Sequence, residues 1–264
     1  MGISADDRVY TLQFPQTDRE GSGMVFKGLQ KISLLDYPGK IAAIVFVGGC
    51  NFRCPFCYNR DLVLNPESLP SVREDEILKH LETKREWLDG VVVTGGEPTI
   101  HPDLPDFLEK VKKLGYSVKL DTNGSNSKML AELLEKNLVD YIALDVKAPL
   151  LKGRYNEATG TRDESVLEEV ESSIALLQDS NGVDYEFRTT VVPKLLNEDD
   201  IVLIAKRISG AKRYYLQQFK PTSTHVDESY SDVAPYPLEV LQGVQKRIAP
   251  NFQICKVRGA RSYG

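Results

Sequence analysis

The sequence predicts an α/β fold in which parallel strands form a partial (β/α)6, TIM-like barrel that is open on one side. The first observation is that strand-like and helix-like stretches alternate from Lys40 onward, which is typical of a parallel sheet with helical crossovers. The second is that about six βα units can be counted, whereas a closed barrel needs eight units in roughly 250 residues. The third is that two strands carry one charged face each.

The elements follow from hydrophobic period and boundary residues. Short β-rich runs predict strands over 41–49, 90–96, 116–124, 140–149, 184–193, 213–221 and 252–259. Apolar residues at helical spacing predict helices over 74–88, 103–115, 127–137, 163–178, 197–208 and 237–248. At the start of the first helix, Ser71 and Glu74 have the spacing of a capping box.

The two strands with charged faces favour a partial barrel. In 141–147, apolar side chains share one face, whereas Asp145 and Lys147 share the other. In 185–191, apolar side chains oppose a face that carries Arg188. Helices are expected to cover the apolar faces. The charged faces need surroundings wetter than a packed core, because an unpaired buried charge is very costly.

Composition excludes some classes of protein. The 264 residues are 41% hydrophobic and 27% charged, which is ordinary for a globular protein. A net charge of −5 gives no basic field for nucleic acid, and no apolar run reaches membrane-spanning length. The acidic first residues lack the apolar stretch of a signal peptide, so we expect a cytoplasmic, reducing location.

Residues 1–23 differ from the rest of the chain. They have no useful period and end in Gly-Ser-Gly before Met24, so we interpret them as a disordered tail or leader and Met24 as the native start. The alternative is a natural extension that docks on the domain. Residues 24–264 are expected to form a single domain.

Three of the four cysteines lie close together. Cys50, Cys54 and Cys57 follow the first predicted strand with the spacing C-x3-C-x2-C, and Cys255 is far away in the sequence. Structural zinc needs four ligands, and a disulfide would leave one thiol over and does not suit a reducing compartment. An iron–sulfur cluster suits clustered thiolates. Three local cysteines leave one iron open, unless Cys255 is the fourth ligand.

Polar residues also end the later strands. Gly95, Gly96 and Glu97 offer a carboxylate beside closely approachable backbone, although an isolated turn is the alternative. Residues 121–124 read Asp-Thr-Asn-Gly, which is also a good turn sequence. In the next two strands, Asp145–Lys147 could be a plain ion pair, and Arg188 could pair with Glu186.

The cysteine loop resembles that of the radical S-adenosylmethionine (SAM) superfamily. The family pattern C-x3-C-x-aromatic-C is matched by Cys50, Cys54, Phe56 and Cys57. The resemblance implies that the three cysteines bind a catalytic [4Fe–4S] cluster whose open iron chelates SAM. An electron from the cluster then cleaves SAM to methionine and a 5′-deoxyadenosyl radical, which abstracts a hydrogen atom.

The resemblance also implies a role for each polar element. The glycines and Glu97 match the element that contacts the SAM ammonium, and we assign Arg188 to the SAM carboxylate. Phe56 would pack against adenine, with packing in the loop core as the alternative. The further cofactor-binding residues implied are Asp121, Thr122, Asn123, Asp145 and Lys147. In glycyl-radical activating enzymes the two aspartates help to form a monovalent-cation site, which hard oxygen ligands suit.

A narrower resemblance is carried by residues 28–59. They are similar to the opening of the activating proteins of anaerobic ribonucleoside-triphosphate reductases, with Asp36 to Lys40 matching outright. Tyr58 departs from that family, which often has His there. The implied partners are a glycyl-radical protein, the anaerobic reductase, and flavodoxin or ferredoxin as electron donor. Two alternatives stay open: a radical SAM enzyme for a deazapurine precursor, peptide or RNA, and a non-enzymatic electron carrier with Cys255 as fourth ligand.

Overall fold

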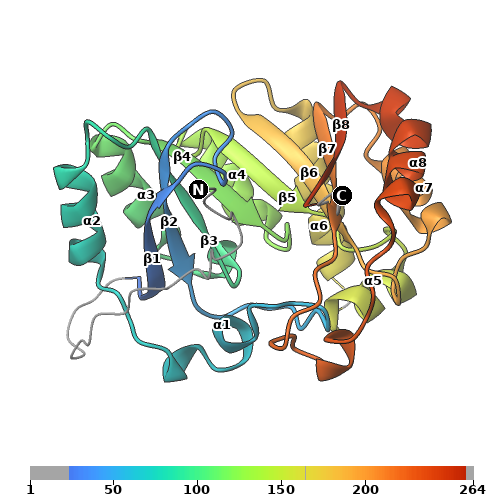
Figure 1. The fold of residues 1–264 in the computed structure, drawn as a ribbon. Coiled ribbons are helices and arrows are strands. Elements are labelled where there is room, and N and C mark those ends of the chain that lie inside the picture. The colour runs from blue at the N-terminus through green and yellow to red at the C-terminus, as the bar shows by residue number, and fades with distance from the viewer. Residues whose placement is uncertain (1–23, 164, 260–264) are drawn as a thin grey trace, which may run out of the picture.

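The structure, a computed structural model, describes residues 24–163 and 165–259, and a single curved sheet runs through it (Figure 1). The strands are β1 (Phe26–Ser33), β2 (Ala42–Val47), β3 (Gly90–Gly95), β4 (Ser117–Thr122), β5 (Tyr141–Asp145), β6 (Asp184–Val191), β7 (Arg213–Gln218) and β8 (Ile254–Arg258). They are hydrogen-bonded in sequence order. Strand β1 is antiparallel to β2, and every later pair is parallel.

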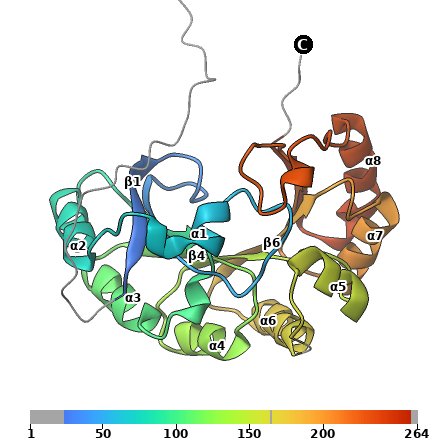
Figure 2. The ribbon, with the colours of Figure 1, turned by 90° about the horizontal axis from the view of Figure 1, so that it is seen from below.

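The longer helices lie on the convex side of the sheet, as the view along the strands shows (Figure 2). The helices are α1 (Arg60–Leu64), α2 (Glu74–Thr83), α3 (Leu104–Lys113), α4 (Ser127–Glu135), α5 (Lys152–Thr159), α6 (Val166–Asp179), α7 (Glu198–Arg207) and α8 (Leu238–Ile248). Within the described ranges β1 and β8 end the sheet and do not pair, so the barrel is open there. The predicted fold class and its six βα units are confirmed.

Several elements differ from the prediction. Strand β1 and the short helices α1 and α5 were not predicted. Helix α2 ends at Thr83 rather than at residue 88. The predicted capping box is wrong, because Arg73 is the N-cap residue and no side chain caps the helix. Ser71 instead accepts a hydrogen bond of 2.9 Å from Lys27 Nζ, a residue at the start of β1.

The two faces of the sheet have different contents. The outer apolar side chains pack against the helices in the main core, as expected. We call the inner, concave side the lumen. The amino ends of the strands fill it with a small apolar cluster that includes Tyr37, Ile44, Val92 and Tyr141. The lumen is therefore packed at that end, and the predicted wetter environment applies to the carboxyl ends only.

A buried ion pair lies next to this apolar cluster. Glu186 is 0% exposed and accepts hydrogen bonds from Arg258 at 2.5 and 2.9 Å and from the Tyr141 hydroxyl. The Arg258 guanidinium also lies 3.3 Å from the centroid of the Tyr215 ring. Burial of this carboxylate is tolerated because its oxygens are matched by donors.

Two predictions concern the limits of the chain. The interpretation of residues 1–23 as a tail concerns residues outside those described, and the prediction of one domain from Met24 stays a prediction. No helix in the described part of the chain is long and apolar enough to cross a bilayer.

Candidate functional site

The candidate site lies at the carboxyl ends of the parallel strands. The cysteine loop follows β2, residues 95–97 end β3, and residues 121–124 end β4. Because parallel strands place these ends at one edge, residues far apart in the sequence meet there. Lys147 follows the end of β5, Arg188 lies in β6, and both pair with Asp145 in the lumen.

The glycine pair binds the cysteine loop to β3. Gly96 N donates to Val47 O at 2.9 Å, and Glu97 N donates to Gly49 O at 2.8 Å. A Cβ on Gly96 would lie only 1.7 Å from Gly49 O. The close backbone approach that we predicted for a ligand is therefore made, at Gly96, to the cysteine loop.

Two further segments hold the other side of the cysteine loop. At the end of α5, Thr159 O accepts from Arg53 N at 2.7 Å, and Gly160 packs so closely that a Cβ would lie 2.4 Å from Arg53 O. After β7, Val226 N donates to Cys57 O at 3.0 Å, and a similar bond joins the next residue to Pro55 O. The loop is thus fixed by backbone contacts to separate parts of the chain.

The three thiols lie in a desolvated environment. Burial raises the pKa of Cys50 to about 11 and that of Cys54 to about 12. The pKa of Cys57 is raised for the same reason, and in all three the positive charge of Lys147 acts in the opposite direction. Binding to a metal would favour the thiolate form that these surroundings otherwise disfavour.

The donor chemistry fits a cluster better than a single ion. In the described ranges, no three His, Cys, Asp or Glu side chains are grouped to hold one metal ion. An iron–sulfur cluster instead spreads its cysteine ligands over different irons. Three thiols on one rigid loop, with a lysine charge nearby, match that requirement.

Glu97 is used within the protein rather than presented to the lumen. It is 1% exposed and accepts four hydrogen bonds: from Thr99 N at 3.0 Å, Thr99 Oγ1 at 2.6 Å, Thr122 Oγ1 at 2.7 Å and Asn123 N at 2.7 Å. Burial raises its pKa, and these hydrogen bonds act to lower it. Glu97 and Thr122 thereby tie the loop after β3 to the loop after β4.

Asn123 and Phe56 also contribute to loop packing. Asn123 Nδ2 donates to Asn51 Oδ1 at 3.0 Å and lies 3.9 Å from Cys50 Sγ. Phe56 is 7% exposed and belongs to the main apolar core, as in the packing alternative. Tyr58, by contrast, is 64% exposed, and its backbone oxygen accepts from the Thr224 hydroxyl at 3.2 Å.

The lumen beside the cysteine loop contains a charged cluster. We call Lys119, Asp121, Asp145, Lys147 and Arg188 the lumen charge cluster. Arg188 Nε donates to Asp145 Oδ1 at 2.8 Å, and Arg188 also bonds Asp121 at 3.4 Å. Lys147 Nζ donates to Asp145 at 2.9 Å. The plain ion pair of Asp145 and Lys147 is thus present, whereas Arg188 pairs with these aspartates and not with Glu186.

Lys119 was missed in the sequence. It is 3% exposed and its ammonium donates to Asp121 Oδ1. The signal was available, since Lys119 lies two residues before Asp121 in a strand and must share its face.

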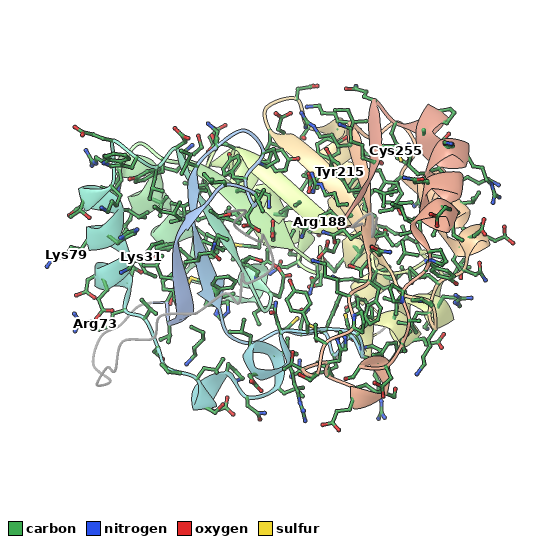
Figure 3. The ribbon with its side chains drawn as sticks, in the orientation of Figure 1. Lys31, Arg73, Lys79, Arg188, Tyr215 and Cys255 are labelled. Atoms are coloured by element: carbon green, nitrogen blue, oxygen red, sulfur yellow. The ribbon has the colours of Figure 1, made fainter. Side chains whose placement is uncertain are left out.

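Cys255 lies away from the cysteine loop. It pairs in register with Tyr214, a core residue, so it faces α8 and not the lumen. Figure 3 shows it beside that helix, whereas Arg188 lies centrally between the two halves of the sheet. This placement does not suit a fourth ligand of a cluster on the cysteine loop.

The chain matches known proteins over most of its length. The model of the Radical SAM superfamily matches residues 44–208. A Methanocaldococcus jannaschii protein, provisionally named a glycyl-radical enzyme activating enzyme, is 34% identical over 240 residues, which cover 88% of this chain and 96% of that one. The pyruvate formate-lyase-activating enzyme of Streptococcus mutans is 27% identical over 217 residues, covering 78% and 80%.

Solved structures share the fold. A radical SAM methyltransferase from Sphaerobacter thermophilus superposes with a TM-score of 0.64 at 14% identity, covering 84% of this chain and 68% of that one. Streptococcus suis SuiB bound to S-adenosylmethionine gives 0.61 at 17% identity, covering 81% of this chain, which spans about half (51%) of SuiB. With this fold and the family match, the protein belongs to the radical SAM superfamily, whose enzymes work with a [4Fe–4S] cluster and S-adenosylmethionine.

Proposed function

We propose that the protein is an activase that generates the glycyl radical of a partner enzyme. The observation that carries this proposal is the 34% identity to an activating-enzyme relative over nearly the whole of both chains. When bound and given one electron by an external donor, the cluster and SAM would supply a 5′-deoxyadenosyl radical as the hydrogen-abstracting group, and a glycine Cα of the partner would be the hydrogen donor.

In this proposal Cys50, Cys54 and Cys57 are the cluster ligands. The support is that they share one loop, fixed on separate sides by backbone hydrogen bonds. Arg188 and Lys147 offer partly exposed cationic groups to the SAM carboxylate.

The remaining predicted SAM contacts take two forms. We assign the backbone of Gly95 and Gly96 to the SAM ammonium, since neither residue has a side chain to cover it, and Asn59 Nδ2 already donates to the Gly95 carbonyl at 3.3 Å. We assign Glu97, Thr122 and Asn123 a positioning role, because their side chains hold neighbouring loops together. Asp121 and Asp145 orient Arg188 in the same way. The assignment of Phe56 to adenine packing stays a prediction.

The anaerobic ribonucleoside-triphosphate reductase is the partner we favour. Residues 28–59 carry that resemblance, although a relative is named for pyruvate formate-lyase. Such a partner implies anaerobic function in the cytoplasm, with flavodoxin or ferredoxin as electron donor.

The test is transfer of deuterium from a peptide. Two peptides, each with the glycine loop of one candidate partner deuterated at Cα, are added to anaerobically reconstituted protein with SAM and a reductant. The proposal expects deuterium in 5′-deoxyadenosine, with the reductase peptide labelling more strongly. Labelled product from neither peptide, while SAM is still cleaved, would refute the activase function. A Cys54→Ala variant controls for cluster-independent cleavage.

One alternative rests on a specific observation. The 7-carboxy-7-deazaguanine synthase of Aquifex aeolicus is 35% identical, but over only 103 residues, or 38% of this chain. The activating-enzyme relative matches more than twice that share, which favours the activase. The electron-carrier alternative is disfavoured because Cys255 faces α8.

A further inference from the structure

In the lumen charge cluster, every carboxylate oxygen of the two aspartates is engaged by a side-chain cation. Asp145 Oδ1 accepts a hydrogen bond from Arg188 Nε at 2.8 Å, and Asp145 Oδ2 accepts one from Lys147 Nζ at 2.9 Å. Asp121 Oδ2 accepts a hydrogen bond from Arg188 Nη1 at 3.4 Å, and Asp121 Oδ1 accepts one from Lys119 Nζ. All four oxygens of the two aspartates therefore accept from a side-chain cation.

The cluster also carries more positive than negative charge. Three side-chain cations face two carboxylates, which leaves one positive charge. Burial acts to raise the pKa of Asp145, but Arg188 and Lys147 outweigh it and hold that pKa below its usual range. The pKa of Asp121 is lowered in the same way by Arg188 and Lys119. Both carboxyls therefore stay ionised at neutral pH.

Lys119 is what distinguishes this arrangement from a metal site. Without it, Asp121 would keep a free oxygen and the cluster would be neutral. Lys119 lies one layer deeper than Asp121, in register with Tyr141 of the apolar cluster, and is 3% exposed. A buried ammonium is tolerated only when it is paired, and Asp121 is its partner.

A metal cation would meet two obstacles here. Hard cations bind through oxygen lone pairs, and each carboxylate oxygen already accepts from a cation. A like charge within a few ångströms in a poorly solvated site is also strongly repelled. At the place where the family resemblance implies a monovalent cation, the side-chain cations of Lys119, Lys147 and Arg188 therefore lie against the aspartate oxygens.

We propose that Lys119 is a built-in counter-ion that replaces an exchangeable monovalent cation, and that it leaves the lumen charge cluster with one positive charge for an anionic ligand group. That this group is the SAM carboxylate rests on the proposed use of Arg188 and Lys147. The replacement itself is a property of the protein alone. Lys119 is in this sense a positioning residue.

The first test uses cluster-free protein and thallium(I) as a probe for a sodium or potassium site. Wild-type protein is expected to leave the thallium NMR line unshifted, and its melting temperature is expected to be equal in sodium, potassium and choline chloride at one ionic strength. Saturable thallium binding by the wild type that Asp121→Asn abolishes would overturn the proposal. Neither readout depends on which partner is activated.

The second test removes the lysine charge. Lys119→Met is expected to bind thallium and to gain thermal stability in sodium or potassium but not in choline. In loaded protein, the SAM-induced change in the cluster's EPR signal should need about tenfold more SAM in choline and recover with sodium. A folded Lys119→Met variant with no cation dependence would refute the proposal.

Two variants serve as controls. Lys112→Met removes a lysine that pairs with Asp140 at 2.8 Å outside the lumen, and it should stay cation-independent. Lys119→Arg keeps the charge and should behave as the wild type. If Lys119→Met does not fold, the wild-type thallium measurement still decides the question.

Discussion

The contact between Gly96 and the cysteine loop leads to a sharp prediction for Gly96→Ala. The added Cβ would lie 1.7 Å from Gly49 O, and Cβ atoms do not approach other atoms within 3.0 Å. The backbones at Gly96 and Gly49 must therefore move apart by about 1.3 Å to admit the Cβ. The neighbouring hydrogen bonds, Gly96 N to Val47 O and Glu97 N to Gly49 O, would be strained or lost.

Gly96→Ala should lower both the stability of the protein and its capacity to assemble the cluster and cleave SAM. Overpacking a tight contact costs about 1–3 kcal/mol of unfolding free energy. A misplacement of about 1 Å in a catalytic group can cost ~100-fold in rate. Because Gly49 directly precedes Cys50, we expect reduced iron content after reconstitution and SAM cleavage reduced by about two orders of magnitude.

The assay compares Gly96→Ala with a matched glycine. At Gly243, on α8, an added Cβ meets nothing within 4 Å, and alanine favours a helix. Gly243→Ala should therefore keep wild-type iron content and activity. Iron content, thermal unfolding and the rate of 5′-deoxyadenosine formation are measured for both. A Gly96→Ala protein with full iron content and wild-type SAM cleavage would show that the contact does not position the cluster.

Three further predictions concern other parts of the site. Cys255→Ser should retain cluster assembly and SAM cleavage, because Cys255 faces α8; loss of the cluster on reconstitution would contradict this. Glu97→Gln should lower the unfolding free energy by about 2 kcal/mol in chemical denaturation, because its amide end cannot accept from the surrounding donors; an unchanged midpoint would exclude the positioning role. Because the pKa of Asp145 is lowered in the folded protein, the unfolded chain takes up this proton at a higher pH than the folded protein does as the solution is acidified. Its stabilisation is thus complete above the unfolded pKa of about 4 and is lost as pH falls below it. Asp145→Asn should therefore flatten the dependence of melting temperature on acid pH, and an equally steep curve would refute the assignment.

Much of the fold could be predicted because its elements are locally distinct. The parallel strands and the amphipathic helices have clear periods, and the six βα units follow from them. Strand β1 was missed because it contains Gly28 and does not alternate cleanly. Helix α5 was missed because its sequence is polar and includes Gly153, so its stability depends on docking of Tyr155 and Ala158.

The candidate site was harder to predict than the fold. Sequence position shows which side chains share an edge of the sheet, and this brought Asp121, Asp145 and Arg188 together. Sequence position does not show which of these polar side chains form hydrogen bonds or ion pairs with each other. Glu97 was expected to face a ligand, whereas its carboxylate accepts two hydrogen bonds from Thr99 in its own segment and two from the end of β4 and the loop after it. Lys119 was overlooked although its spacing from Asp121 places both side chains on one face of β4; the ion pair between them is what the structure adds.

The polar residues of the site therefore divide by what their atoms already contact. Glu97, Thr122 and Asn123 bind adjacent loops, so substitutions there should act first on stability and cluster assembly. Arg188 and Lys147 keep donors and partial exposure toward the lumen, so their substitution should act first on ligand affinity. Substitutions at these two sets of residues should therefore give different phenotypes: loss of stability and cluster assembly for the first set, and loss of ligand affinity for the second. Sequence spacing places both sets at one edge of the sheet, and only their contacts in the fold show which side chains remain free to bind a ligand.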